Sequence, residues 1–565
     1  MCFMLLASAA AIAQPGPQFA RISRYVSVRD GTRLAMNIYR PVVNGAVVDT
    51  KLPVIFLFTP YRARYHTPDG KLVELDQVHR LGVDRLLAAG YVIAEADIRG
   101  KGASFGARRG FQDRTEANDG YDLVQWLSSQ PFSNGVVGMM GCSYLGGSTV
   151  HVASTRPPAL KAAFIGATDL DKFDFVRAGG ITAQFNTRPD EPLSDDLASM
   201  PMDEDTDGSL LRAAVAQHAG NTPMAPLWYG MPYRDSVSPL TGNRFWEEVG
   251  PYPYLPALKQ SGIATYYWGN LKDEPTSQVI VAAANLGSKL LIGPGSHCVA
   301  PPEFDLGGEI QRFFDHHLKG SDNGIERDPR NTWWVENAAA GQHWQRSNLL
   351  PGAAATPRTW YLANATTPEP SLIEKKPNVP GTRDFSVDYH VGEGEYFAFW
   401  VEPQDEHGVT FTSAPLAKAL LLEGYPLAHL RLAADRDDVN AFVYLEEIDV
   451  TGKVEVLAHG RLAASYRATA TPPFDMLGLP WHPGREADRQ PLVPGKAADL
   501  DIALLPVSHL VAAGHRLRVT ITGADPRQRN LAQIRLDPPP RISLQLGGAG
   551  GSQIQLPVRQ PPFKP

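Results

Sequence analysis

Ser143 lies in the segment that most constrains how this chain can fold. Residues 135–140 (GVVGMM) predict a buried strand, and residues 146–155 predict a helix that must end before Pro157. Between them the chain reads GCSYLG. A sharp turn from strand to helix exposes the side chain at its tip and needs small residues where the backbone crosses closely. The segment therefore predicts a nucleophile elbow with Ser143 at its tip, although the second glycine of the usual G-x-S-x-G pattern falls one residue later.

Strands and helices alternate on both sides of this elbow. Short apolar runs predict buried strands, and runs with apolar residues at helical spacing predict helices. The predicted strands are 52–58, 91–96, 135–140, 160–167, 264–269 and 289–293, and the predicted helices are 85–89, 116–129, 146–155, 277–286 and one around 313–320. This alternation is typical of βαβ units, so it predicts an α/β fold with a parallel sheet.

An irregular stretch interrupts the alternation. Residues 168–254 are acidic, rich in methionine and aromatic residues, and follow no clear period. The simplest account is a single sheet with an insert that covers one of its ends. We therefore expect the first part of the α/β core at 14–167, the insert at 168–258 and the second part of the core at 259–350.

The C-terminal third has a different character. Proline and glycine punctuate short alternating runs, such as 441–450 and 516–522, and Thr451-Gly452 gives a hairpin signal. The region shows little helical periodicity. Residues 351–565 therefore predict a separate β-sandwich or jelly-roll domain.

A nucleophilic serine needs a base, and the base needs an acid to orient it. In a sheet of this type the acid and the base follow the serine in chain order, each after a strand. Asp273 follows the predicted strand 264–269, and His297 follows the predicted strand 289–293. We therefore expect a catalytic triad of Ser143, Asp273 and His297, with Glu274 as the alternative acid.

The N-terminus and the cysteines bear on where the protein works. Residues 1–13 (MCFMLLASAAAIA) form an apolar run that ends in a small-x-small site, which matches a signal peptide although no basic residue precedes the run. We expect a periplasmic or secreted protein. Cys142 and Cys298 flank the proposed serine and histidine; we favour two small buried thiols over a disulfide, which an oxidising compartment would permit.

Composition and spacing exclude several function classes. With 53 basic and 60 acidic residues the net charge is −7, and no basic stripe marks a nucleic-acid surface. No apolar run approaches the ~20 residues that cross a membrane. Gly100, Gly102 and Gly106 lack dinucleotide-loop spacing, and the adjacent His316 and His317 point to different helix faces. We expect no nucleic-acid partner, no membrane association, no cofactor and no metal, and we leave open whether the chain forms a homo-oligomer.

Several motifs together resemble a known family. They are RDGTRL at 29–34, TPY at 59–61, DIRGKGASFG at 97–106, GCSYLG at 141–146, residues 313–323 and GHRLR at 514–518. With these motifs the chain resembles the cocaine esterase, α-amino-acid ester hydrolase and X-prolyl dipeptidyl-peptidase family of serine hydrolases. The resemblance implies an α/β-hydrolase core, a helical cap inserted after the sixth strand, and a C-terminal jelly roll. It also implies an oxyanion hole formed by the Tyr61 hydroxyl and the backbone N–H of Tyr144.

The insert supplies candidates for substrate contacts. Its aromatic residues are expected to form both the cap core and the wall of an acyl pocket, and we single out Phe173, Trp228 and Trp246 as substrate-binding residues. Acidic residues also follow the fourth strand closely, at positions 169, 171 and 174. One of them could bind a substrate ammonium, as carboxylates do in α-amino-selective relatives, or all three could be solvated charges.

The expected function is a secreted serine hydrolase that cleaves carboxylic esters through an acyl-enzyme, with α-amino-acid esters or β-lactam side-chain amides among the substrates considered. Within the enzyme class the alternative is an X-Pro dipeptidyl-peptidase-like aminopeptidase. An alternative from another class is a catalytically dead protein whose jelly roll binds carbohydrate.

Overall fold

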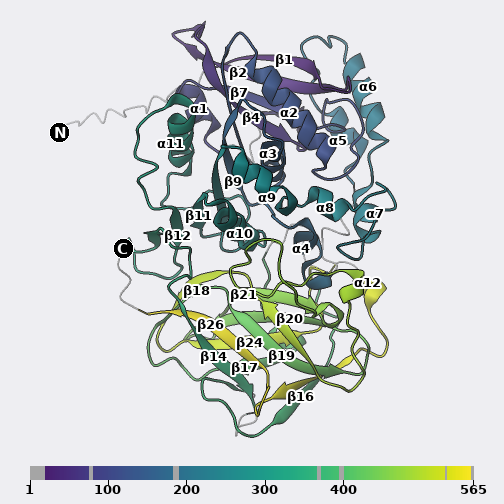
Figure 1. Ribbon diagram of the computed structural model, residues 1–565, viewed down its shortest axis with the longest axis vertical. Coiled ribbons are helices and arrows are strands. Elements are labelled where there is room, and N and C mark those ends of the chain that lie inside the picture. The colour runs from purple at the N-terminus through teal and green to yellow at the C-terminus, as the bar shows by residue number, and fades with distance from the viewer. Residues whose placement is uncertain are drawn as a thin grey trace, which may run out of the picture.

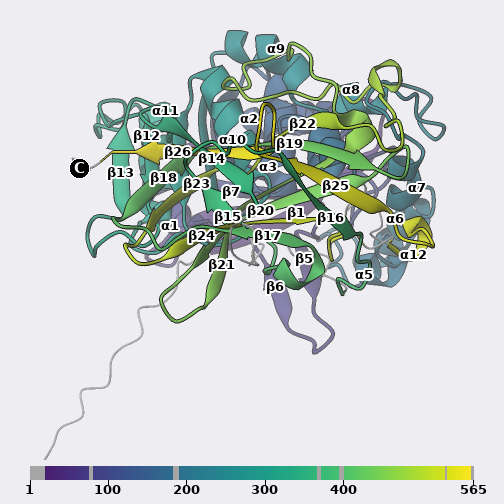
Figure 2. The same ribbon diagram turned by 90° about the horizontal axis from the view of Figure 1, so that it is seen from below.

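The computed structural model describes residues 19–75, 81–181, 190–364, 371–392, 400–528 and 531–560. In Figure 1 these residues form an α/β unit and, below it, a unit made mainly of strands, which we call the β domain. Figure 2 shows the strands of the β domain in front of the helices of the α/β unit. The expected signal peptide at 1–13 lies outside the described residues.

One mixed sheet forms the centre of the α/β unit. Its strands follow the order β1-β2-β7-β4-β8-β9-β10-β11-β12-β13. Pairing is parallel from β7 through β12 and antiparallel at both edges. The strands are β1 (Phe19–Ser27), β2 (Arg33–Val43), β4 (Leu52–Thr59), β7 (Val92–Asp97), β8 (Ser133–Cys142), β9 (Leu160–Gly166), β10 (Ala264–Asn270), β11 (Lys289–Gly293), β12 (Asn331–Trp334) and β13 (Trp344–Ser347). The short β3 (Ala46–Val47) pairs with β2, and β5 (Arg64–His66) and β6 (Leu72–Glu74) form a separate two-stranded sheet.

Alternating side chains of β4 bury both faces of this sheet. Ile55 and Leu57 pack on one face, with apolar residues of α1 (Val83–Ala88) and α11 (Leu306–Lys319). Val54, Phe56 and Phe58 pack on the other, with residues of α2 (Arg114–Ser128) and α3 (Tyr144–Ser154). A strand buried on both faces reads as a continuous apolar run, which is why this part of the fold could be predicted from sequence.

The expected insert is present between β9 and β10. It contains short helices: α4 (Lys172–Val176), α5 (Leu193–Leu197), α6 (Ser209–His218), α7 (Met224–Tyr229), α8 (Phe245–Val249) and α9 (Leu255–Gln260). The main sheet resumes at β10, which is followed by α10 (Thr276–Leu286). The insert therefore leaves the core after the strand that directly follows the Ser143 helix.

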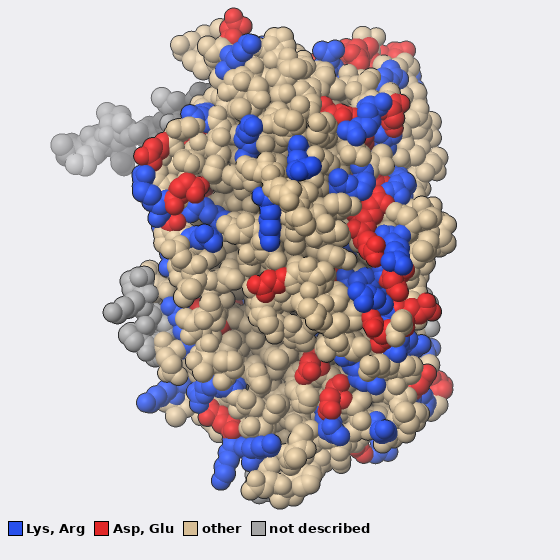
Figure 3. Space-filling model, viewed as in Figure 1, with Lys and Arg blue, Asp and Glu red and all other residues tan. Residues whose placement is uncertain are grey.

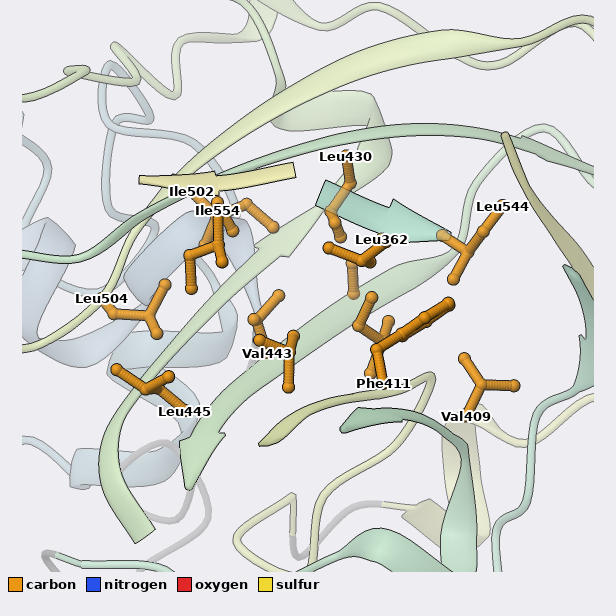
Figure 4. Close-up of a cluster of buried hydrophobic side chains, with 14 of the residues drawn as sticks. Leu362, Val409, Phe411, Leu430, Val443, Leu445, Ile502, Leu504, Leu544 and Ile554 are labelled. Atoms are coloured by element: carbon orange, nitrogen blue, oxygen red, sulfur yellow. The ribbon is translucent and has the colours of Figure 1, made fainter. Parts of the chain in front are cut away.

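The β domain encloses a core of its own. Its strands are β14 (Thr356–Ala363), β15 (Ser371–Ile373), β16 (Gly381–Ser386), β17 (Val409–Thr412), β18 (Leu420–Gly424), β19 (Leu427–Ala434), β20 (Asn440–Ile448), β21 (Val454–Ala463), β22 (Ala498–Ala503), β23 (Val507–Val511), β24 (Arg516–Thr522), β25 (Arg541–Leu546) and β26 (Gln553–Arg559); a short helix, α12 (Leu531–Ile534), precedes β25. Figure 4 shows inward side chains such as Phe411, Val443 and Ile554 filling the space between the strands. The predicted hairpin joins β20 to β21 at Thr451-Gly452.

Two edges of the main sheet were not predicted. The antiparallel pair β1–β2 and the strands β12 and β13 lie outside the runs that sequence patterning identified. In β1 and β2, arginines and other polar residues break the apolar run: Arg21, Arg24 and Arg33 are examples. β1 is the edge strand of the pair, and edge strands tolerate such residues; β2 lies between β1 and β7.

On the face shown in Figure 3, acidic and basic side chains are interspersed. Among the described residues, no helix combines the length and apolar character needed to cross a membrane.

Candidate active site

Ser143 lies at the tip of a strained turn between β8 and α3. Its backbone has φ 60° and ψ −129°, which a non-glycine residue rarely adopts. The neighbouring glycines are required by close packing. A Cβ on Gly141 would lie 2.3 Å from Leu145 Cβ, and a Cβ on Gly146 would lie 2.3 Å from the Gly166 carbonyl oxygen. The structure thus forms the predicted elbow, and the displaced glycine at 146 is the one that lets α3 approach β9.

His297 and Asp273 meet at the carboxyl ends of adjacent strands. His297 Nδ1 lies 2.9 Å from Asp273 Oδ2 and 3.1 Å from Oδ1. Asp273 is fully buried; burial raises the pKa of its carboxyl, and the neighbouring His297 opposes that rise. An imidazole whose Nδ1–H donates to a carboxylate carries its lone pair on Nε2, where a general base needs it. The alternative acid, Glu274, instead pairs with Arg461 and Arg527.

Tyr61 approaches the serine from the loop after β4. Its hydroxyl donates to Ser143 Oγ across 3.3 Å. The backbone N–H of Tyr144 belongs to the first residue of α3, where helix N–H groups lack intrahelical acceptors. A side-chain donor and a backbone donor therefore flank Ser143, as an oxyanion hole requires.

A cluster of buried polar side chains forms hydrogen bonds with the first residue of α3. The Tyr144 hydroxyl donates to Glu116 at 2.6 Å and the Ser148 hydroxyl donates to the same carboxylate at 2.8 Å. Burial raises the pKa of Glu116 to about 7, against the lowering effect of these two hydrogen bonds. Gln112 Nε2 donates to the Tyr144 carbonyl at 2.9 Å. These contacts fix the residue that follows the nucleophile.

Ser143, His297 and Tyr61 line one cavity of about 240 Å³. Trp228 of the insert, for which we predict a contact with substrate, also lines it. Phe173 and Trp246 do not: they are buried behind Trp228, where the Trp246 ring stacks on Trp228 at 4.9 Å and meets Phe173 edge-on at 5.5 Å. The expectation that these two contact substrate is therefore corrected, because their rings are used in the core of the insert.

The acidic residues after β9 are not three solvated charges. Asp169 accepts from Lys172 Nζ at 2.6 Å and lines the cavity with it. Asp171 is paired with Arg234 through both carboxylate oxygens, at 2.6 and 2.7 Å. Asp174 faces a different cavity, of about 150 Å³, between the insert and the β domain. Asp169 is thus the member of this group that lies at the Ser143 cavity.

Cys142 and Cys298 form a disulfide. This corrects the expectation of two free thiols. The physical reason is positional: each cysteine neighbours a residue of the triad, and assembling the triad brings their Cα atoms to 5.9 Å, within the range that a disulfide spans.

His316 and His317 do come near a third potential metal ligand. With Glu326 they offer ligand atoms that all lie within 4.8 Å of one another. His316 Nδ1 is also 2.9 Å from the Ser321 carbonyl oxygen. None of the three is among the described residues that line the Ser143 cavity.

Comparison with known proteins places this geometry in a family. A family model described as X-Pro dipeptidyl-peptidase (S15 family) matches residues 30–299, and one described as the X-Pro dipeptidyl-peptidase C-terminal non-catalytic domain matches residues 323–533. A putative serine esterase of Mycobacterium bovis is 30% identical over 95% of this chain and 95% of that protein. The chain belongs to the X-Pro dipeptidyl-peptidase (S15) family.

The S15-family chain is also similar to other proteins over most of its length. The cocaine esterase of a Rhodococcus species is 22% identical, over 88% of this chain and 90% of that enzyme. A CocE/NonD family hydrolase from Staphylococcus aureus has a crystal structure that superposes with a TM-score of 0.72, at 19% identity and 97% coverage of both chains. The α/β unit and the strand-rich C-terminal domain are thus the fold of this group.

Three residues near the Ser143 cavity were not predicted from the sequence. Gln112, Glu116 and Lys172 are buried around the elbow and the cavity. Lys172 Nζ donates to Gln112 at 2.7 Å and lies 4.7 Å from the centre of the Phe111 ring. The sequence signal that could have identified this site is Lys172 itself, a lysine among acidic and apolar residues in the segment DLDKFDF.

Proposed function

We propose that this S15-family protein is a serine hydrolase of carboxylic esters. The observation that carries the proposal is the His297–Asp273 hydrogen bond at the cavity that also exposes Ser143 and Tyr61. A dead scaffold that only binds carbohydrate would have no need for a strained serine, a base oriented by a buried acid, and a hydroxyl directed at the serine.

The geometry supports a two-step acyl transfer. Ser143 Oγ attacks the ester carbonyl carbon while His297 Nε2 takes the hydroxyl proton. The Tyr61 hydroxyl and the Tyr144 N–H bind the oxyanion that forms. The carbon–oxygen bond to the leaving alcohol breaks as His297 returns the proton to that oxygen. Water, deprotonated by His297, then attacks the acyl carbon. The bond from that carbon to Ser143 Oγ breaks as His297 returns the proton to Oγ, which releases the acid and the free serine.

The matching family description supports a second candidate, cleavage of X-Pro dipeptides from a free N-terminus. Such a substrate carries an ammonium, which needs an uncompensated carboxylate. At this cavity Asp169 is paired with Lys172, Glu191 with Lys101, and Asp196 with Lys101 and His218. Asp190 also lines the cavity; it is exposed and accepts a backbone N–H. These pairings favour neutral acyl groups over ammonium-bearing ones.

The test is chromophore release from p-nitrophenyl butyrate and from Gly-Pro-p-nitroanilide, by the wild type and by Ser143→Ala in parallel. The proposal expects wild-type hydrolysis of the ester, little of the anilide, and no turnover by the variant. Turnover by Ser143→Ala would overturn the proposed mechanism. Preference for the anilide would favour the peptidase.

The proposal also covers the role of the insert, the fold type of the β domain and the location of the protein. The helical insert acts as a cap over the site, since Trp228 and Lys172 of the insert line the cavity. The β domain is a jelly roll, as its antiparallel strands around a single core suggest. The protein is exported to a periplasm or beyond, which the Cys142–Cys298 disulfide supports because disulfides persist in oxidising compartments.

A further inference from the structure

Asp273, the proposed catalytic acid, lies in the chain between two residues that form ion pairs with the β domain. Lys272, before Asp273, pairs with Glu455 of β21. Glu274, after it, pairs with Arg461 of β21 at 2.9 Å and with Arg527, which follows β24, at 2.5 Å. The loop that carries Asp273 in the α/β unit is therefore held on both sides by charged residues of the other unit.

The Glu274 pairs are buried. The side chains of Glu274, Arg461 and Arg527 are 8%, 5% and 3% exposed. Solvent screens such pairs weakly, and removing one partner leaves a buried charge without compensation. These contacts are therefore much stronger constraints than ion pairs at the surface.

Arg527 is itself rigidly placed. Asp525 accepts from its Nε at 2.8 Å and from its Nη2 at 2.7 Å, and the Tyr444 hydroxyl donates to the same carboxylate at 2.7 Å. Burial raises the pKa of Asp525, but Arg527 and the Tyr444 hydroxyl outweigh that effect and hold the pKa below its usual value, so the carboxylate stays ionised. A fixed guanidinium of the β domain thus meets the neighbour of the catalytic acid.

The position of Asp273 tolerates little error. A catalytic hydrogen bond must be held within about 0.5 Å for full effect. The segment between β10 and α10 spans only residues 271–275, and its backbone is also tied by Lys272 N–H to the Gly295 carbonyl at 2.9 Å. A displacement of Glu274 would therefore be passed directly to Asp273 and to its contact with His297.

We propose that Arg461 and Arg527 are positioning residues that act through Glu274 on Asp273, so that the β domain takes part in the catalytic step. The inference rests on the proposed triad. The matching family model describes the C-terminal domain as non-catalytic. The proposal gives this domain a defined role, which is to hold the orientation of the acid without touching substrate.

The test compares Arg461→Gln, Arg527→Gln and Glu274→Gln with a matched control, Arg518→Gln. Arg518 is a buried arginine that pairs with Glu446 and Asp405 inside the β domain. For the variants of Arg461, Arg527 and Glu274 we expect kcat for p-nitrophenyl butyrate to fall about tenfold or more, while KM changes less than about twofold. We expect the rate of fluorophosphonate labelling of Ser143 to fall in parallel. Arg518→Gln should lower the melting temperature and leave kcat unchanged.

Two additional variants separate positioning from general destabilisation. Arg527→Lys keeps the charge and should recover part of kcat, and the double variant Glu274→Gln/Arg527→Gln should be no slower than the slower single one, because both act through one contact. Glu274→Gln keeps the side-chain volume and carries the test if an arginine variant does not fold.

The inference would be overturned if the variants of Arg461, Arg527 and Glu274 fold and keep the wild-type kcat. It would also be overturned if Arg518→Gln loses as much kcat as they do. Neither result would contradict the proposed triad. A wild type that neither hydrolyses ester nor labels at Ser143 would instead overturn the proposed function, and the inference with it.

Discussion

Cys142 and Cys298 are joined by a disulfide, and they are the direct chain neighbours of Ser143 and His297. The bond links the end of β8 to the loop after β11, which lie 156 residues apart in sequence. It therefore ties the nucleophile and the base to each other independently of the sheet between them.

Removing this bond should weaken both stability and catalysis. A cross-link that closes a loop of this length restricts the unfolded chain, so Cys142→Ala/Cys298→Ala should lose roughly 3–5 kcal/mol of unfolding free energy. Chemical denaturation measures this loss. A reducing agent should lower the stability of the wild type and leave the double variant unchanged. Equal masses of the native and the reduced wild type would show instead that the thiols are free.

Replacing Tyr61 by phenylalanine should slow the chemical step. The variant loses the hydroxyl that donates to Ser143 Oγ. One oxyanion donor contributes about 3–4 kcal/mol in the transition state, so kcat should fall about 10²- to 10³-fold with KM nearly constant. Steady-state kinetics on p-nitrophenyl butyrate measure this. The control is Tyr65→Phe, a tyrosine of β5 outside the cavity. A Tyr61→Phe enzyme as fast as wild type would remove Tyr61 from the oxyanion hole.

Adding a single methyl group at Gly146 should disrupt the elbow. The new Cβ would lie 2.3 Å from the Gly166 carbonyl oxygen, so α3 must move away from β9. We expect Gly146→Ala to lose about 3 kcal/mol or more of unfolding free energy and nearly all activity. Gly307→Ala is the matched control. Its nearest contact would be an ordinary 3.5 Å, and alanine favours the helix, so stability should rise slightly. Similar behaviour of the two variants would contradict the close approach of α3 to β9.

The buried Glu116 should make stability depend on pH. Burial raises the pKa of this carboxyl to about 7, above its unfolded value of 4.5. The native state therefore holds a proton that the unfolded chain releases, and the resulting stability is full below pH 4.5 and is lost as pH rises through about 7. Relative to wild type, Glu116→Gln should gain up to about 3 kcal/mol when pH is raised through this window.

Urea unfolding at a series of pH values measures that difference. The comparison between variant and wild type cancels the contributions of Asp97 and Asp119, whose pKa values burial raises to about 6. A difference that does not change with pH would mean that Glu116 titrates as an exposed carboxyl.

Sequence patterning recovered those parts of the fold in which one physical effect dominates. The run 52–58 is apolar because β4 is covered on both faces, and Gly141 and Gly146 are small because backbones cross there. The order of Ser143, Asp273 and His297 followed from the strands that precede them.

The remaining features depend on contacts between distant segments, which no local pattern encodes. The Lys172–Gln112 hydrogen bond joins residues 60 positions apart, and the Glu274–Arg527 pair joins residues 253 apart. Aromatic residues such as Phe173 and Trp246 are equally suited to a pocket wall and a packed core, so composition could not distinguish the two. The disulfide was underrated because sequence gives no distance between two cysteines.

The most direct test of the account is to find where a fluorophosphonate reacts. The wild type, Ser143→Ala and His297→Ala are incubated with the reagent, and peptide mass spectrometry locates the adduct. The account predicts a single adduct on the Ser143 peptide of the wild type, none at that peptide in Ser143→Ala, and strongly slowed labelling in His297→Ala. An unlabelled Ser143 in an enzyme that hydrolyses esters, or an adduct on another residue with loss of activity, would contradict it.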